Sequence, residues 1–191
     1  SELGLMHNIV KIILVLFLCL VISDIEGFSS HHGHGQPKGP PADIPAHIKE
    51  RTSPDGTGIN LNNSQVGIPG LMFMTNDPHL THVTSMALKG NLLGDEGAKI
   101  LAESAAFKKV EKLSLWDNGL TALGAKQIAA SAHLGNLTEL NLMKNRVGDE
   151  GAIALAQSPN VAHLTALDLS DNDISDAGAI AIANSPHLAN L

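Results

Sequence analysis

The chain contains four asparagines spaced 27 residues apart, and the residues around each of them recur at the same offsets. Aliphatic side chains stand eight, five and three positions before each asparagine, and another stands two positions after it. A repeat of this length indicates a solenoid, in which each turn of the chain packs only against the turns before and after it. The four asparagines are Asn91, Asn118, Asn145 and Asn172.

The offsets within one repeat predict its secondary structure. The two aliphatic residues nearest the asparagine are separated by one position, which places both side chains on one face of a strand. After the asparagine, small and apolar residues follow at spacings of three and four, which is typical of one face of an amphipathic helix. In the first clear repeat these are Gly97, Ala98, Leu101 and Ala102. Each repeat is therefore expected to be a short strand, a turn and a helix.

These repeats resemble leucine-rich repeats of the ribonuclease-inhibitor-like type over residues 83–191. Residues 94–104 (GDEGAKILAES) and 148–158 (GDEGAIALAQS) also resemble the repeats of bacterial GALA-type proteins. The resemblance implies the fold class: an α/β leucine-rich repeat solenoid of period 27, a right-handed βα superhelix with a curved parallel sheet inside and helices outside. It also implies a protein that works mostly by binding other proteins.

The chain divides into segments of different character. Residues 1–5 are expected to be a non-native or upstream extension, because Met6 is a plausible start. Residues 28–55 are rich in His, Gly and Pro and predict a disordered linker. Residues 56–82 are expected to be a degenerate N-terminal capping repeat, with Ser64 in the asparagine column. The four clear repeats are 83–109, 110–136, 137–163 and 164–190, and Leu191 begins a fifth.

Residues 6–27 have the architecture of a secretory signal peptide, with Lys11, an apolar run over residues 12–22, and small residues at Ser23 and Gly27. The run is shorter than the roughly 20 residues that a transmembrane helix needs. We therefore expect the protein to be secreted or exported, extracellular or periplasmic, and the alternative is a membrane anchor formed by the uncleaved segment. Cleavage would remove the one cysteine of the chain, so no disulfide is expected.

Most of the recurrent polar residues are best explained by structure. The four asparagine amides can both donate and accept, so stacked copies can satisfy backbone groups of adjacent turns. A row of catalytic or ligand-binding amides is the less favoured alternative. Asp95, Asp149 and Asp176 precede or begin the expected helices and predict N-caps. The tract of His31, His32 and His34 predicts no metal site, because no ordered frame is expected around it.

Strand residues that alternate with the core leucines are expected on the concave face, where such solenoids bind ligands. Trp116 and Met143 stand in the same column of neighbouring strands, about 4.8 Å apart, and predict an apolar spot surrounded by charges. In the alternative interpretation Trp116 only covers a gap or folds over its neighbours. The expected partner-binding residues are Lys89, Lys112, Trp116, Asp117, Glu139, Met143, Lys144, Asp168 and Asp171.

Charge and size limit the kinds of partner. The formal net charge of −7 at pH 7 argues against nucleic acid, for which a basic face is expected. The lysines concentrate in residues 83–136, whereas acidic residues dominate residues 137–191. Four short strands present only a few hundred Å², whereas a standard interface needs about 800 Å² from each partner. These repeats alone therefore predict a small binding surface.

The sequence thus favours an exported leucine-rich repeat protein that acts as a scaffold for protein–protein interaction through its concave face. No catalysis, cofactor, metal or small-molecule substrate is expected, and the protein partner is not identified. One alternative is the substrate-recognition part of a larger enzyme or effector that continues beyond Leu191. Another is a GTPase-activating regulator, since Ran GTPase-activating proteins share this repeat type and Arg146 stands in a turn at a strand end.

Overall fold

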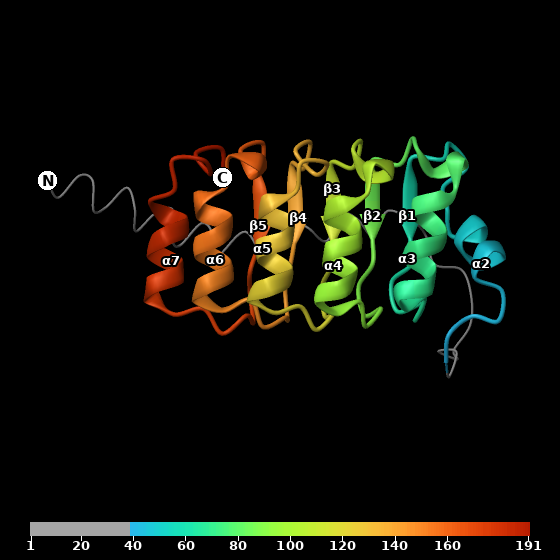
Figure 1. The fold of residues 1–191 in the computed structure, drawn as a ribbon, viewed down its shortest axis with the longest axis horizontal. Helices are drawn as coiled ribbons and strands as arrows, with labels where there is room; N and C mark the ends of the chain where they lie inside the picture. The colour runs from blue at the N-terminus through green and yellow to red at the C-terminus, as the bar shows by residue number, and fades with distance from the viewer. Residues whose placement is uncertain (1–38) are drawn as a thin grey trace, which may run out of the picture.

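The computed structural model describes residues 39–191, which form one parallel sheet and a row of helices beside it (Figure 1). The five strands lie side by side in sequence order, and each pairs in parallel with the next. This arrangement confirms the predicted α/β solenoid. The strands are β1 (Gly58–Asn60), β2 (Ser85–Ala87), β3 (Lys112–Ser114), β4 (Glu139–Asn141) and β5 (Ala166–Asp168).

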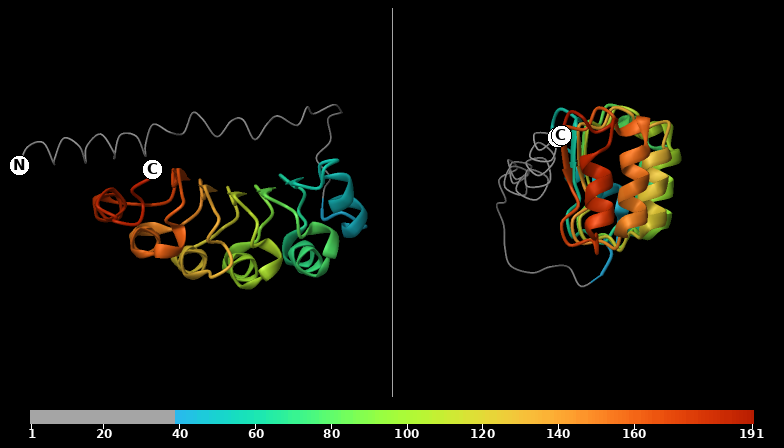
Figure 2. Two further views of the ribbon diagram at one scale, coloured as in Figure 1. Left: turned by 90° about the horizontal axis from the view of Figure 1, so that it is seen from above. Right: turned by 90° about the vertical axis from the view of Figure 1, so that its left-hand side faces the viewer.

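A helix follows each strand, and together these helices make the outer layer of the molecule. Seen from above, the strands line the inner, concave side and the helices the outer, convex side (Figure 2). Each helix of the row packs mainly against the helices before and after it. The helices are α3 (Gly67–Asn76), α4 (Gly94–Glu103), α5 (Ala122–Ala130), α6 (Gly148–Gln157) and α7 (Asp176–Ala183), and short 3₁₀ helices η3 (Pro78–Leu80), η4 (Ala105–Phe107) and η5 (Pro159–Val161) lie on three of the return paths.

The register of the sheet equals the period of the sequence. Met86 pairs with Leu113, and Leu113 pairs with Leu140, so partners are always 27 residues apart. Parallel bonding also continues beyond the three-residue strands, since the N–H of Asp117 donates to the carbonyl of Met143 at 3.0 Å. Equivalent residues of successive repeats therefore stack in straight columns up to the asparagine, and a column can be read directly from the sequence.

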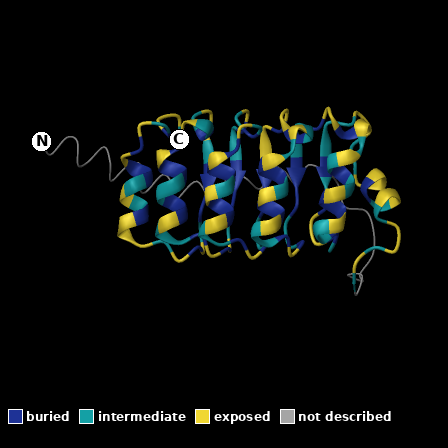
Figure 3. Ribbon diagram, viewed as in Figure 1, coloured by how far each residue is buried: buried dark blue, intermediate teal, exposed yellow. Residues whose placement is uncertain are grey.

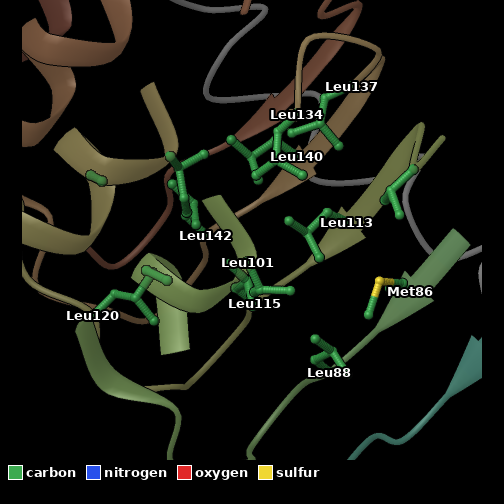
Figure 4. Close-up of a cluster of buried hydrophobic side chains, with 14 of the residues drawn as sticks. Met86, Leu88, Leu101, Leu113, Leu115, Leu120, Leu134, Leu137, Leu140 and Leu142 are labelled. Atoms are coloured by element: carbon green, nitrogen blue, oxygen red, sulfur yellow. The ribbon is translucent and has the colours of Figure 1, made fainter. Parts of the chain in front are cut away.

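The core lies between the sheet and the helices. Every strand and turn leucine that Figure 4 labels points into this layer, and Figure 3 shows the corresponding strands as buried. Leu88, Leu115 and Leu142, which share one column, are each 0% exposed. Burying one such side chain contributes about 1.5–3 kcal/mol, so each repeat gains most of its stability from these columns. The helix residues Leu101, Ile128 and Leu155 close the layer from the convex side.

The asparagine side chains tie successive turns together by their amides. Asn145 is 6% exposed; its Oδ1 accepts from the N–H of Asn118 at 3.1 Å and of Leu120 at 3.0 Å. Its Nδ2 donates to the carbonyls of Leu142 at 2.8 Å and of Leu115, in the preceding turn, at 3.0 Å. The Nδ2 bond to a carbonyl of the preceding turn recurs at Asn91, Asn118 and Asn172. One side chain type thus satisfies backbone groups that a turn would otherwise leave unpaired in the interior.

The prediction that Asp95 and Asp149 cap their own helices is wrong. Helices α4 and α6 have no side-chain cap, and both aspartates lie inside the first turn. The carboxylate of Asp95 instead reaches the next helix, where it accepts from the N–H of Thr121 at 2.7 Å, from Thr121 Oγ1 at 2.6 Å and from the N–H of Gly124 at 2.9 Å. The helix starts are stacked, so an acidic side chain reaches the orphan N–H groups of a neighbour more easily than its own.

Asp149 makes the same contacts with the start of α7. It accepts from the N–H of Ser175 at 2.8 Å, from Ser175 Oγ at 2.6 Å and from the N–H of Gly178 at 3.0 Å. These hydrogen bonds, led by the one from the Ser175 hydroxyl, lower the pKa of Asp149. Asp176 is the first residue of α7 and does not cap it, because Ser175 accepts from the N–H of Ala177 in that role.

The prediction of a disordered linker through residue 55 is also wrong for residues 43–55. Helix α2 (Ile44–Glu50) begins at Asp43, whose Oδ1 accepts from the N–H of Ala46 at 3.0 Å, and Pro45 lies in its first turn, where a proline costs nothing. Ile48 is 1% exposed and joins the core. One well-placed apolar side chain is enough to anchor a short helix against an open solenoid end, although it gives no periodicity in the sequence.

Beyond α2, the segment 51–57 folds back along β1 and covers the outer edge of the sheet. The N–H of Asn60 donates to the carbonyl of Arg51 at 3.0 Å, and Thr52 bridges to Ile59 in the antiparallel sense. The bend between them is held by Asp55, whose carboxylate accepts from Ser53 Oγ and from Thr57; these bonds lower its pKa to about 2. The free edge of β1 is thereby blocked, as edge strands require.

Several expectations concern residues 1–38, which lie outside the described part of the chain. They include the upstream extension, the signal peptide, the histidine tract and most of the linker. Within residues 39–191, no helix is both long enough and apolar enough to cross a membrane.

Candidate functional site

The concave face of the sheet is built from four columns of side chains that run across the strands. The first two columns consist of residues within the strands, and the other two consist of residues between the strands and the asparagine turns. The first column is Ser85, Lys112, Glu139 and Ala166; the second is Ala87, Ser114, Asn141 and Asp168; the third is Lys89, Trp116, Met143 and Ser170; the fourth is Gly90, Asp117, Lys144 and Asp171.

The second column is buried. Asn141 is 8% exposed and Asp168 is 7% exposed, although Asp168 was expected to contact a partner. Each side chain bonds to the backbone of its own turn. Asn141 Oδ1 accepts from the N–H of Met143 at 2.9 Å, and Asp168 Oδ1 accepts from the N–H of Ser170 at 2.9 Å. These short polar side chains bond to the backbone two residues ahead, which is their usual local preference. They support the strand ends, and the accessible surface comes from the other columns.

Trp116 is half-buried and carries a cation on its ring. Lys89 Nζ lies 3.3 Å from the centroid of the indole. The indole Nε1 is buried and has no hydrogen-bond acceptor among the described residues. Met143 follows Trp116 in the same column and is also half-buried. Trp116 and Met143 are thus neighbours in one column, called here the Trp116–Met143 pair, and Lys89 lies over the ring of Trp116.

Charged side chains on both sides of this spot pair across neighbouring strands. Lys112 Nζ lies 2.7 Å from Glu139 Oε1, and Lys144 Nζ lies 2.9 Å from Asp117 Oδ2. These pairs are solvent-accessible, with side-chain exposures of 45% and 26% for the first and 60% and 45% for the second. Such pairs contribute about 0–1 kcal/mol. Breaking these pairs costs little free energy, so charged groups of a partner can take the place of either member.

The far end of the concave face is acidic. Asp171 is exposed at the end of the fourth column, and Asp173 and Asp176 are exposed on the loop and helix start that follow. At the other end Lys89 is the first charged residue of the third column, and Lys112 is exposed on β3. The predicted gradient from basic to acidic is therefore laid out along the sheet, from β2 towards β5.

Two surface cavities lie away from this face. The larger, of about 630 Å³, is lined by α2, the following loop, and residues that include Phe73, Asp77 and His79. The smaller, of about 350 Å³, lies between α4 and α5 beside Ser131 and His133. Ser131 Oγ donates to the carbonyl of Ala102 at 2.6 Å and accepts from the N–H of His133, so the pair is not arranged as nucleophile and base.

Side chains that could bind a metal ion are not clustered in the part of the chain from residue 39 onward. No group of three or more His, Cys, Asp or Glu side chains there is placed to hold a metal ion. His47 lies in α2; burial lowers its pKa, and its Nε2 is 3.0 Å from Ser64 Oγ. These features belong to the N-terminal cap rather than to the concave face.

The three contacts on the concave face could have been found from the sequence. Lys89 and Trp116, Lys112 and Glu139, and Asp117 and Lys144 are each separated by one period of 27 residues. Residues one period apart in the same column are neighbours in adjacent strands, and opposite charges there attract. Six of the nine expected partner-binding residues therefore contact one another in these three pairs. The remaining three are Met143, Asp168 and Asp171.

Comparison with known proteins supports the same architecture. A family model described as "Leucine Rich repeat" matches residues 79–102, 133–156 and 162–183. The matched segments cover β2, β4 and β5, all of α7, and all but the last residue of α4 and of α6. No curated protein matches the chain. With five parallel strands alternating with helices at a constant register, and with three segments that match this repeat family, the chain has the fold of an α/β leucine-rich repeat solenoid.

Proposed function

We propose that this protein is an exported, non-enzymatic scaffold that binds a protein partner on its concave face. Leucine-rich repeat proteins generally act as binding scaffolds, which supports the class of function. The observation that carries the proposal is the Trp116–Met143 pair, an apolar spot at the centre of the face with weak ion pairs on both sides. A desolvated aromatic anchor with a polar rim is the usual arrangement of an interaction hot spot.

The chemistry of the face also describes the partner. An apolar or aromatic group would pack on Trp116 and Met143, and a basic group would meet Asp171 at the acidic end. The area available from four columns is below that of a standard interface, so the affinity expected from these repeats alone is modest. Export is proposed from the sequence of residues 6–27 and is tested separately by the N-terminal sequence of the mature protein.

Binding is tested with one concave and one convex variant. Trp116→Ala should reduce the affinity for a partner by at least tenfold, which corresponds to about 1.4 kcal/mol, while far-ultraviolet circular dichroism stays unchanged. Leu123→Ala is the matched control, because Leu123 is a 54% exposed apolar residue on the opposite, helical side. Equal affinity of the Trp116 variant and the parent would contradict a concave site, and equal loss in both variants would indicate binding at another surface.

A further inference from the structure

The turn after β1 contains an unassigned acceptor motif for a covalent modification. Residues Asn62, Asn63 and Ser64 have the form Asn-X-Ser with X other than proline, which is the acceptor signal for an N-linked oligosaccharide. This motif is meaningful only in a surface turn of an exported chain. The described structure places it in a turn: Asn63 has a φ of 54°, and both Asn62 and Asn63 are exposed.

The side-chain oxygen of Asn62 accepts a hydrogen bond, whereas its side-chain nitrogen makes none within residues 39–191. Asn62 Oδ1 accepts from the N–H of Lys89 at 3.0 Å, which fixes the side chain on the turn. Among the described residues, no hydrogen bond involves Asn62 Nδ2. The nitrogen that would carry a sugar is therefore not needed for the fold. A glycan on it leaves the contact with Lys89 intact.

The hydroxyl residue of the motif departs from the repeat. Ser64 stands in the column that holds asparagine in the four repeats that follow. It is 4% exposed, and its Oγ contacts His47 Nε2 in α2 instead of the backbone of a preceding repeat. The first turn of the solenoid has no earlier repeat to bond, which makes a serine structurally sufficient here.

We infer that Asn62 accepts an N-linked oligosaccharide when the chain enters a secretory lumen. This inference rests on the proposed export. A lumenal transferase would join Asn62 Nδ2 to the anomeric carbon of an oligosaccharide carried on a polyprenyl diphosphate. The new N–C bond forms as the bond from that carbon to the diphosphate oxygen breaks; the amide loses one proton and the polyprenyl diphosphate leaves.

The position of the glycan has a consequence for binding. Asn62 occupies the third column of the concave face, one period before Lys89 and two before Trp116. A sugar there stands at the β1 end of the face, beside the Lys89–Trp116 pair. It would direct a protein partner towards β3, β4 and β5, where Met143 and Asp171 lie.

A second motif of the same form, Asn136, Leu137 and Thr138, provides an internal control. It precedes β4, so it lies at the amino ends of the parallel strands, whereas Asn62 follows β1 and lies at their carboxyl ends. Asn136 is exposed too, but its Nδ2 donates to the carbonyl of Lys108 at 2.7 Å, and Thr138 Oγ1 donates to Glu111 at 3.2 Å. Both residues of that motif thus have a structural role that Asn62 Nδ2 lacks.

The test is translation of the full chain with endoplasmic-reticulum microsomes, followed by protease protection and gel mobility. Protected chains should show a mobility shift that an endoglycosidase reverses. The shift from Asn62 should disappear in Asn62→Gln and in Ser64→Ala, and it should remain in Ser64→Thr and in Asn136→Gln. Enzymatic release of the glycan converts the modified asparagine to aspartate, and peptide mass spectrometry should find aspartate at residue 62.

Failure of the modification and failure of export are distinguishable. Chains that are protected but unaffected by Asn62→Gln would overturn the inference. Chains that are not protected would contradict export, and the same variants are then tested with residues 1–27 replaced by a cleavable leader of known efficiency. Transfer precedes folding, so the mobility readout does not depend on whether a variant folds.

Discussion

Each asparagine that recurs at the period of 27 pairs with backbone N–H and carbonyl groups of two successive turns. Asn145 accepts two backbone N–H groups and donates to the carbonyls of Leu115, Leu142 and Met143. An amide offers both donors and acceptors on one planar group, which matches the mixed set of unpaired groups where the chain leaves the strand. Neither a carboxylate nor a hydroxyl could make all of these bonds.

Asn145→Ala should therefore destabilise the protein strongly. It leaves several buried backbone groups without partners, at about 1–3 kcal/mol for each group that water cannot reach. We expect a loss of at least about 2 kcal/mol in the free energy of unfolding measured in urea. Asn136→Ala is the matched control, because Asn136 is exposed and makes one bond to Lys108. Similar losses in the two variants would contradict the role assigned to the buried amide.

At the level of elements, the helices from α4 to α7 alternate in how they begin. Helices α4 and α6 begin at glycines with positive φ, 56° at Gly94 and 59° at Gly148, whereas α5 and α7 begin after a hydroxyl cap, Thr121 or Ser175. The aspartate in the first turn of α4 or α6 then completes the cap of the following helix. This contact explains why Gly124 and Gly178 are small: a Cβ at either position would come within 2.6 Å of the aspartate oxygen.

Asp149→Asn should loosen the start of α7. Loss of the charge weakens the bonds to Ser175 and Gly178, and hydrogen exchange at the amides of Ala177 and Gly178 should become faster. Glu150→Gln is the control, since Glu150 is exposed and pairs with Lys126 at 2.6 Å on the helical side. Faster exchange in both variants, or in neither, would contradict the cap between helices.

Protonation of Asp149 at low pH should loosen the start of α7 as Asp149→Asn does. The pKa of Asp149 is lowered in the folded state by its bonds to Ser175, so the carboxylate stabilises the fold fully above its ordinary pKa of 3.8. That contribution is lost as the pH falls through the lower, folded-state pKa. In the parent protein, the protection of the amides at the start of α7, measured relative to the intrinsic exchange rate at each pH, should therefore fall below about pH 4, and in Asp149→Asn this fall should be absent.

At the scale of the whole molecule, the array is one-dimensional and its two ends differ from its middle. Each helix packs on its neighbours, and the core runs without interruption from Ile48 to Leu188. Stability in such an array is approximately a sum of terms for single repeats and for the interfaces between neighbours. Helix α2 and the segment 51–57 cover the first turn, where an uncovered repeat would expose Leu61 and Leu71 to water.

Two substitutions should separate the end from the middle. Leu140→Ala removes a 0% exposed side chain of the interior strand β4 and should cost about 2–5 kcal/mol in the free energy of unfolding. Ile48→Ala should release α2 and reduce hydrogen-exchange protection in β1 and α3, with β4 and β5 unchanged. Equal loss of protection in all strands of the Ile48 variant would contradict a local cap.

The repeat columns were predictable because their physical cause is local and periodic. The aliphatic residues around Asn91 and Asn118 recur with one period, and burial follows from alternation along a strand. The fate of Asp95 and Asp168 could not be predicted in the same way. Each has two sets of hydrogen-bond donors within reach, on its own element or beyond it, and only the distance between stacked turns selects one of them.

The sequence by itself determined the period, the alternation of strand and helix, the core columns and the concave position of Trp116, because each follows from spacing along the chain. Tertiary structure alone decided two contacts that no column predicts: the aspartate cap of the next helix and the packing of α2 through Ile48. These contacts depend on how closely one turn lies on the next, and that distance is set by packing of the whole layer rather than by any local pattern.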